Sequence, residues 1–230
     1  MKYCYVLGRR NIYTKMHTST KYQSASSNVT PLGSVVPKQL VEDTTKALSK
    51  LKVALGGDVS GYVACRLHMN ITELNDALAA EQVDGVALAM YNIEKRAQSV
   101  IIGDQTGIGK GRQAAAMIRY GLLSGYLPVF FTDRYTLFSD MYRDCKALGI
   151  KDARPLVVNA GVSVVDFDHI IEEKGKETPD EIWSPMSEEE EDAKIEAELM
   201  QLYQKQYEVV YKAPKKNVLQ GLFEIGDIPS

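Results

Sequence analysis

The sequence predicts an α/β fold in which a helical N-terminal segment precedes a parallel β-sheet. Three short apolar runs, at 99–102, 128–132 and 155–159, are separated by stretches with helical spacing of apolar residues. Parallel strands need long crossover connections, which are usually helices, so this alternation favours a parallel sheet. A glycine-rich stretch follows the first run, and residues 37–97 before it show only helical periodicity.

Residues 37–97 are expected to form four helices. The first begins after Pro37 and stops at Gly56-Gly57, with leucines recurring on one face. Residues able to cap a helix N-terminus then mark the next two starts: these are Asp58 for a helix over 59–68, and Asn70 or Thr72 for a helix over 72–80. The fourth helix is expected over 81–97, with Val83, Val86, Ala87, Met90 and Ile93 as its buried stripe.

The remaining segments complete a five-part organisation. Residues 1–36, rich in Ser, Thr, Tyr and Lys, are predicted to be an extended basic arm. Residues 98–165 are the expected sheet lobe, and residues 166–212 an acidic helical insertion. The run Glu-Glu-Glu-Glu-Asp at 188–192 suits the first turn of a helix, because negative charge is favourable at a helix N-terminus. Residues 213–230 are expected to return toward the lobe.

The helix of the insertion carries a narrow apolar stripe that includes Leu199, Leu202 and Tyr203. Two interpretations remain open for this stripe. It provides a contact for a protein partner, or it packs back on its own lobe.

Composition restricts the class of protein. The chain has 230 residues and a formal net charge of −3, so no overall basic field indicates nucleic-acid binding. Its three cysteines are few, odd in number and far apart, which argues against a disulfide framework and fits a reducing compartment. No apolar run approaches the roughly 20 residues of a membrane-spanning helix.

The motif that carries chemistry is IIGDQTGIGKGR at residues 101–112. A phosphate-binding loop needs closely spaced glycines, so that backbone amides point at the anion, and a helix with a lysine directly after it. Gly107, Gly109 and Lys110 meet these needs between an expected strand and an expected helix. The nucleotide-binding candidates are Gln82, Thr106, Gly107, Ile108, Gly109, Lys110, Gly111 and Arg112.

Two positions depart from the usual phosphate-loop pattern. Asp104 stands where the first glycine is expected, and Gly111 stands where a Ser or Thr hydroxyl usually holds magnesium. Thr106 is the nearest other hydroxyl. The plain alternative is a glycine turn with a surface lysine. A dinucleotide-binding site is disfavoured, because the pattern G-x-G-x-x-G would need a glycine where Arg112 stands.

At this motif the chain resembles a family. GDQTGIGKGR followed by QAAAMIRYG is similar to the strawberry-notch-type helicase-like ATPases of superfamily 2, including phage and bacterial members related to the phage defence-against-restriction helicases. That family carries Gly-Lys-Gly-Arg where others carry Gly-Lys-Thr. AEQVDGVALAM resembles the glutamine motif of such enzymes, and PVFFTDRYTLFSDMYRDCKALG resembles their next motif, which leads toward the nucleic-acid backbone. The likeness covers roughly residues 22–225.

The resemblance implies a RecA-like lobe that binds ATP and Mg2+. Lys110 would neutralise phosphate, the amides of 107–111 would cradle it, and Arg112 would add charge to the phosphates or to the loop. Gln82 would read adenine; its ordinary alternative is a glutamine at an exposed helix start.

The resemblance also implies partners and a location. Nucleic acid, as DNA, would be the partner of the full-length protein, in the bacterial host cytoplasm or a phage virion. The family's acidic strand motif and second lobe come beyond the last residues here, so we expect the first lobe of an ATPase, poorly active alone. The alternative is a virion-associated or protein-binding module that keeps the lobe as a scaffold and uses the arm and the insertion as contact surfaces.

Overall fold

A computed structural model describes residues 19–27, 29–104, 107–151, 155–158, 162–170, 194–195, 197–201 and 207–213. The chain divides into two compact units, residues 1–128 and residues 129–230. No helix within the described residues is long and apolar enough to cross a lipid bilayer.

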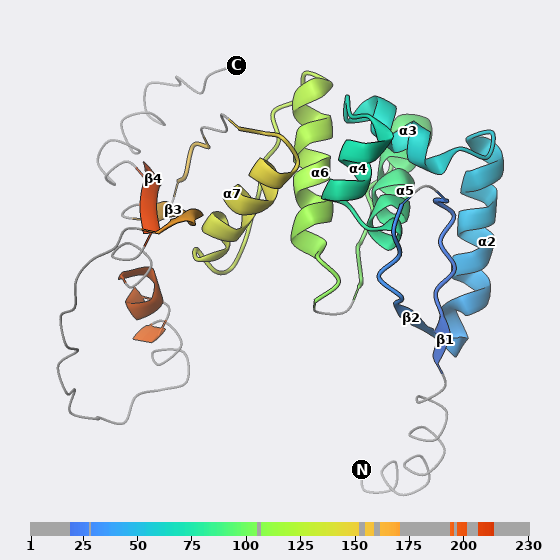
Figure 1. Cartoon of the computed structure of the whole chain (residues 1–230), viewed down its shortest axis with the longest axis horizontal. Coiled ribbons are helices and arrows are strands. Elements are labelled where there is room, and N and C mark those ends of the chain that lie inside the picture. Colours follow the sequence, from blue (N-terminus) through green and yellow to red (C-terminus); the bar gives the residue numbers. More distant parts are fainter. Residues whose placement is uncertain are drawn as a thin grey trace, which may run out of the picture. The chain divides into compact units, whose positions relative to one another are not determined.

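The first unit is helical (Figure 1). Its helices are α2 (Lys38–Ala54), α3 (Val59–Arg66), α4 (Ile71–Ala77), α5 (Ala80–Arg96) and α6 (Lys110–Leu123). Before them, β1 (Ser19–Lys21) and β2 (Val35–Pro37) form an antiparallel pair beside the start of α2. The four helices expected in 37–97 and the helix expected after the glycine-rich stretch are therefore confirmed, with bounds that shift by a few residues.

Two capping residues act as the sequence predicts. The side chain of Asp58 accepts a hydrogen bond from the Gly61 amide at 2.7 Å. Asn70 and Glu73 form a reciprocal capping box, in which each side chain accepts a hydrogen bond from the backbone amide of the other. These local bonds satisfy amides that a helix leaves without partners in its first turn, and they fix where α3 and α4 begin.

Helix α5 lies at the centre of this unit and contacts α2, α3 and α6. Its expected stripe is buried from Val83 to Met90, whereas Ile93 is 40% exposed. The core also takes leucines from the preceding helices and small residues from α6. Its buried apolar residues include Leu48, Leu51, Val63, Leu67, Leu74, Leu78, Ala115 and Ala116.

The second unit is built from α7 (Leu137–Ala147) and an antiparallel pair, β3 (Ser163–Ile170) and β4 (Tyr207–Lys212). Its small core comprises Val157, Val162, Val164 and Ala213, with aromatic side chains around it. Helix α7 is tied to β3 by a hydrogen bond from the Val165 amide to Ser139 Oγ and by the ion pair between Lys146 and Asp166. The expected insertion, 166–212, thus begins and ends in residues of paired strands.

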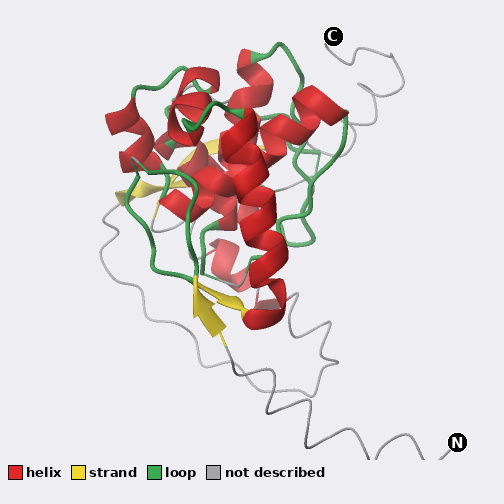
Figure 2. Cartoon of the chain, turned by 90° about the vertical axis from the view of Figure 1, so that its right-hand side faces the viewer, coloured by secondary structure: helices red, strands yellow, loops and turns green. Residues whose placement is uncertain are grey.

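The described residues do not contain the expected parallel sheet. The runs 99–102, 128–132 and 155–158 are not strands, and both sheets are two-stranded and antiparallel. Helices make up most of the described chain in Figure 2, and the strands are short. A parallel strand needs partners and cover on both faces, but Ile101 is 94% exposed and Phe131 is 88% exposed. An apolar run is therefore not sufficient to specify a strand in these three segments.

Candidate functional site

The glycine loop, residues 103–111, leads directly into the start of α6. Gly107 and Gly109 have φ angles of 94° and 84°, a left-handed conformation that glycine adopts without strain. Gly109 is the N-cap residue of α6, so no side chain caps the helix, and the first turn contains no acidic residue. An uncapped helix N-terminus favours an anion, because its free amides point toward the ligand and the helix dipole attracts negative charge.

Asp104 connects the glycine loop to the start of α6 through both its backbone and its side chain. Lys110 is exposed, and its Nζ donates to the Asp104 carbonyl oxygen at 2.8 Å. Gln113 Nε2 donates to the Asp104 carboxylate at 2.8 Å. The aspartate that replaces the usual first glycine is therefore a structural anchor, contacted by two residues from the first turn of α6.

Gln82 holds the other side of the glycine loop. The residue is buried, and its Oε1 accepts from the Ala79 amide at 2.9 Å. Its Nε2 donates to the Ile108 carbonyl at 2.8 Å and lies 3.4 Å from the Gly109 carbonyl. A Cβ at Gly109 would come within 2.3 Å of this nitrogen, so the loop backbone rests against the side chain. The amide of Gln82 is thus engaged by the protein itself.

Arg112 contacts the end of helix α4. Its guanidinium donates to the carbonyl of Ala77, the last residue of α4, at 3.1 Å. Two turns further along the same face of α6, Arg119 donates to the carbonyl of Leu67 at 2.7 Å, at the end of α3. Positive charge is favourable at helix C-termini, so these two arginines fasten α6 to its neighbours.

The structure brings together most of the predicted site residues. Gln82, Ile108, Gly109 and Lys110 meet at the start of α6, with Gly107 in the loop and Gly111 in the first helical turn. Thr106 lies outside the described residues, as do Leu202 and Tyr203 of the predicted partner stripe. Leu199 is described and is 39% exposed.

Sequence reasoning missed Gln113. It is fully buried at the fourth position of α6, among apolar residues of the core. A glutamine in such a position needs a hydrogen-bonding partner, and that signal was present in the sequence as a polar residue interrupting the apolar face QAAAMI. Its partner, the carboxylate nine residues upstream, could not be read from the pattern.

The groups at the start of α6 fit a magnesium ion that is bound to phosphate better than one that protein side chains bind directly. Within the described ranges, no three His, Cys, Asp or Glu residues are grouped as a metal site. The start of α6 offers amides and a lysine, which are ligands for phosphate and not for a cation. Magnesium would therefore reach this site with the nucleotide.

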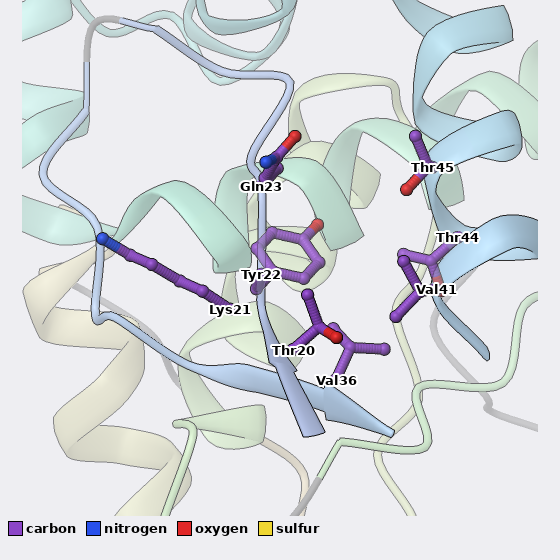
Figure 3. A pocket seen from close by; sticks show the side chains of 8 residues that line it. All are labelled: Thr20, Lys21, Tyr22, Gln23, Val36, Val41, Thr44 and Thr45. Carbon is purple, nitrogen blue, oxygen red and sulfur yellow. The ribbon is translucent and has the colours of Figure 1, made fainter. Parts of the chain in front are cut away.

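A second concavity lies elsewhere in the first unit, between β1, β2 and α2 (Figure 3). Tyr22 and Thr20 face it from one side, and Val41 and Thr44 from the other. Its volume is about 100 Å³, whereas ligand pockets usually hold roughly 300 Å³ or more. We assign no ligand to it.

A family of known proteins matches the chain. Residues 36–178, more than half of the chain, match the family described as P-loop containing NTP hydrolase pore-1. No curated protein matches the chain, and no solved structure matches it. The matched range contains the whole glycine loop, Gln82 and Gln113.

Proposed function

The chain belongs to the P-loop containing NTP hydrolase pore-1 family, and from this premise we propose that it is the ATP-binding first lobe of a helicase-like ATPase that acts on DNA. The family membership covers nucleotide binding and hydrolysis. The choice of ATP, the RecA-like character of the lobe and the helicase-like activity rest on the resemblance of GDQTGIGKGR and its flanking motifs to the strawberry-notch-type ATPases.

One observation carries the proposal: the uncapped start of α6 next to Lys110. The left-handed glycines leave the helix N-terminus without an obstructing side chain, and a Cβ at Gly107 would meet nothing within 4 Å. Backbone amides in this arrangement bind phosphate oxygens, and the helix dipole adds to the attraction. A lysine beside them supplies a full positive charge for the terminal phosphates.

Binding would require a local exchange of contacts. Lys110 would leave the Asp104 carbonyl to meet phosphate, which is a small movement for an exposed and flexible side chain. Gln82 and Gln113 would keep their hydrogen bonds to the loop and preserve its shape. We therefore assign Gln82 to holding the loop; to read adenine, its amide would first have to leave Ala79 and Ile108.

Magnesium would be held by the nucleotide phosphates and by water. Gly111 provides no hydroxyl at the usual position, and Thr106 is the nearest candidate in sequence. The ion would neutralise phosphate charge during transfer of the terminal phosphoryl group.

Calorimetry with Mg-ATP tests the site. We expect the wild type to bind and Lys110→Ala to bind at least tenfold more weakly, because the variant loses the charge that meets the phosphates. Lys95→Ala, an exposed lysine in the last turn of α5, is the control and should bind like the wild type. Equal binding by the wild type and Lys110→Ala would refute the site.

Nucleotide and nucleic-acid specificity test the finer proposal. GTP, CTP and UTP should compete with labelled ATP less well than ATP itself. Single-stranded and double-stranded DNA should change the affinity for ATP if the lobe belongs to a DNA-dependent enzyme, since coupling between two ligands acts in both directions. If no DNA changes the affinity for ATP, the helicase-like part of the proposal is refuted, whereas the proposal of nucleotide binding stands.

A further inference from the structure

Asp84 is a completely buried carboxylate whose hydrogen bonds come from the N-terminal part of the chain. Its Oδ2 accepts from the Tyr22 hydroxyl at 2.9 Å, the Ser24 hydroxyl at 2.7 Å and the Ala25 amide at 3.0 Å. Its Oδ1 accepts from the Ser26 amide at 3.0 Å. Burial, followed by the charge of Asp84, raises the pKa of Tyr22 above its ordinary value, which keeps the hydroxyl protonated as a donor.

Glu81, one turn earlier on α5, holds a second stretch of the same segment. Its carboxylate accepts from the amides of Leu32 at 2.8 Å, Gly33 at 3.1 Å and Ser34 at 3.2 Å, and also from the Ser34 hydroxyl. Burial raises the pKa of Glu81, but hydrogen bonds from the Leu32 amide, its own backbone amide and the amide and hydroxyl of Ser34 outweigh it, so the pKa lies below its ordinary value.

The docked segment, residues 22–27 and 29–34, therefore covers the first turn of α5. Two contacts with the backbone of Ala80 add to those of the carboxylates: the Ala80 amide donates to the Thr30 carbonyl, and Ser26 Oγ donates to the Ala80 carbonyl. Ala25 and Val29 are each 7% exposed, so the segment also contributes to the core.

Gln82 lies between these two carboxylates in the same helical turn. While Glu81 and Asp84 bind the docked segment, Gln82 binds the carbonyls of the glycine loop. One turn of α5 thus connects the N-terminal segment on one side with the glycine loop on the other.

Loss of the docked segment would disturb this turn. The two carboxylates would lose nearly all their donors at once, and a buried carboxylate without donors is strongly unfavourable. Both side chains would turn toward the water that replaces the segment, and the turn would also lose the bonds of Ala80 to Thr30 and Ser26. A shift of this turn would move Gln82 away from Ile108 and Ala79. The loop would lose the support that holds Gly109 in place.

We infer that the docked segment is a positioning element of the nucleotide site, and that Asp84 and Glu81 are positioning residues that act on the glycine loop through Gln82. This inference rests on the proposed function, because it assigns a further set of residues to the same nucleotide site. None of these positioning residues needs to touch the nucleotide.

Two isosteric variants of the full chain give the first measurement. In Asp84→Asn the new NH2 group must face either the Ala25 or the Ser26 amide, and in Glu81→Gln it must face an amide of residues 32–34. Each variant should bind Mg-ATP at least tenfold more weakly than the wild type. Asp76→Asn, an exposed aspartate on α4, is the matched control and should bind normally.

Hydrogen exchange on the wild type gives a second measurement that does not depend on how the variants fold. If docking favours ATP by tenfold, ATP must favour docking by the same factor. The amides of Ala25, Ser26 and residues 32–34 should therefore exchange about tenfold more slowly at saturating Mg-ATP. Gln82→Leu should abolish this slowing, because the connection between α5 and the loop is lost.

The outcomes separate this inference from the proposed function. ATP binding by the wild type, with unchanged exchange in the docked segment, would overturn the inference and leave the nucleotide site standing. Normal ATP binding by a folded Asp84→Asn variant would do the same. Failure of the wild type to bind any nucleotide would overturn both.

Discussion

At the scale of single residues, the glycine loop depends on a close approach between α5 and α6. Gln113 is fully buried on α6, and its Nε2 holds Asp104. Its Oε1 has no hydrogen-bond partner within the described residues. A Cβ at Gly85 of α5 would come within 2.3 Å of this oxygen. Glycine at this position therefore gives Gln113 the space from which it reaches the loop.

Gly85→Ala should destabilise the protein although it improves helix propensity. The alanine would gain about 0.8–1 kcal/mol as a helix former, whereas overpacking a buried site costs about 1–3 kcal/mol. We expect a net loss of about 1 kcal/mol in the free energy of unfolding, measured in urea, together with weaker ATP binding. In Gly103→Ala the added Cβ meets nothing within 4 Å, so this control should lose no stability. A gain in stability for Gly85→Ala would mean that Gln113 has room to move.

At the scale of elements, a cluster around Glu94 joins α3, α5 and α6. The carboxylate of Glu94 accepts from Arg66 and from the hydroxyls of Tyr62 and Tyr120 at 3.1 and 3.2 Å. The guanidinium of Arg66 also lies 3.5 Å from the centre of the Tyr62 ring. The hydrogen bond from Arg66 lowers the pKa of Glu94 below its ordinary value, against the opposing effect of burial.

The lowered pKa of Glu94 predicts a stability change in acid. A carboxylate with a depressed pKa in the folded state stabilises the protein above its unfolded pKa of about 4.3, and this contribution is lost as the pH falls through the folded pKa. Glu94→Gln should lower the free energy of unfolding at pH 7 by about 1.5–3 kcal/mol, the range for a hydrogen bond to a charged group. Unfolding in urea at a series of pH values should show the two proteins converging below about pH 4. Glu42→Gln, on an exposed part of α2, is the control, and a pH-independent difference for Glu94→Gln would contradict the assignment.

Prediction from sequence succeeded where an element is specified locally. Asp58 and Asn70 mark the starts of α3 and α4, because a cap and the amides it binds lie within one helical turn. The strands expected at 99–102, 128–132 and 155–159 depended on distant partners, which an apolar run does not specify. The positions of Gly109 and Lys110 were predictable for the same local reason.

The contacts of Asp84 were beyond such reasoning. Its partners include backbone amides, which every residue except proline carries and which leave no mark in a sequence. Arg112 was expected to add charge to the phosphates or to the loop, and its bond to the Ala77 carbonyl depends on how α4 and α6 pack. The contacts of Asp84 and of Arg112 both depend on packing between segments that are far apart in the sequence.

At the scale of the whole molecule, the second unit contains the paired strands β3 and β4, which precede and follow residues 171–206 in the sequence. Ile170 at the end of β3 is paired with Tyr207 at the start of β4, so the two ends of this stretch are neighbours in the hairpin. The core around Val164 and Ala213 is formed by residues before and after the stretch. A short connection between these ends is therefore compatible with the strand pairing.

Replacement of residues 171–206 by a short Gly/Ser linker should leave both units folded. Calorimetry should give an affinity for Mg-ATP within about twofold of the wild type, because the glycine loop and its supports belong to the first unit. Circular dichroism should show helix content retained apart from that of the removed residues. Unfolding of the shortened chain would show that the removed residues contribute to a core.

The contacts of the docked segment also set an order of events during synthesis and folding. Asp84 lies 58 to 62 residues beyond its partners in the chain, so this pairing closes a far longer loop than the caps of α3 and α4 do. On the ribosome, residues 22–34 emerge before α5, and Asp84 and Glu81 are not there to bind them until α5 has followed. Contacts between near neighbours in sequence form fastest, so the helices assemble before the segment docks. The nucleotide site would then acquire its final shape among the last steps of folding, completed by a segment that was made before the glycine loop itself.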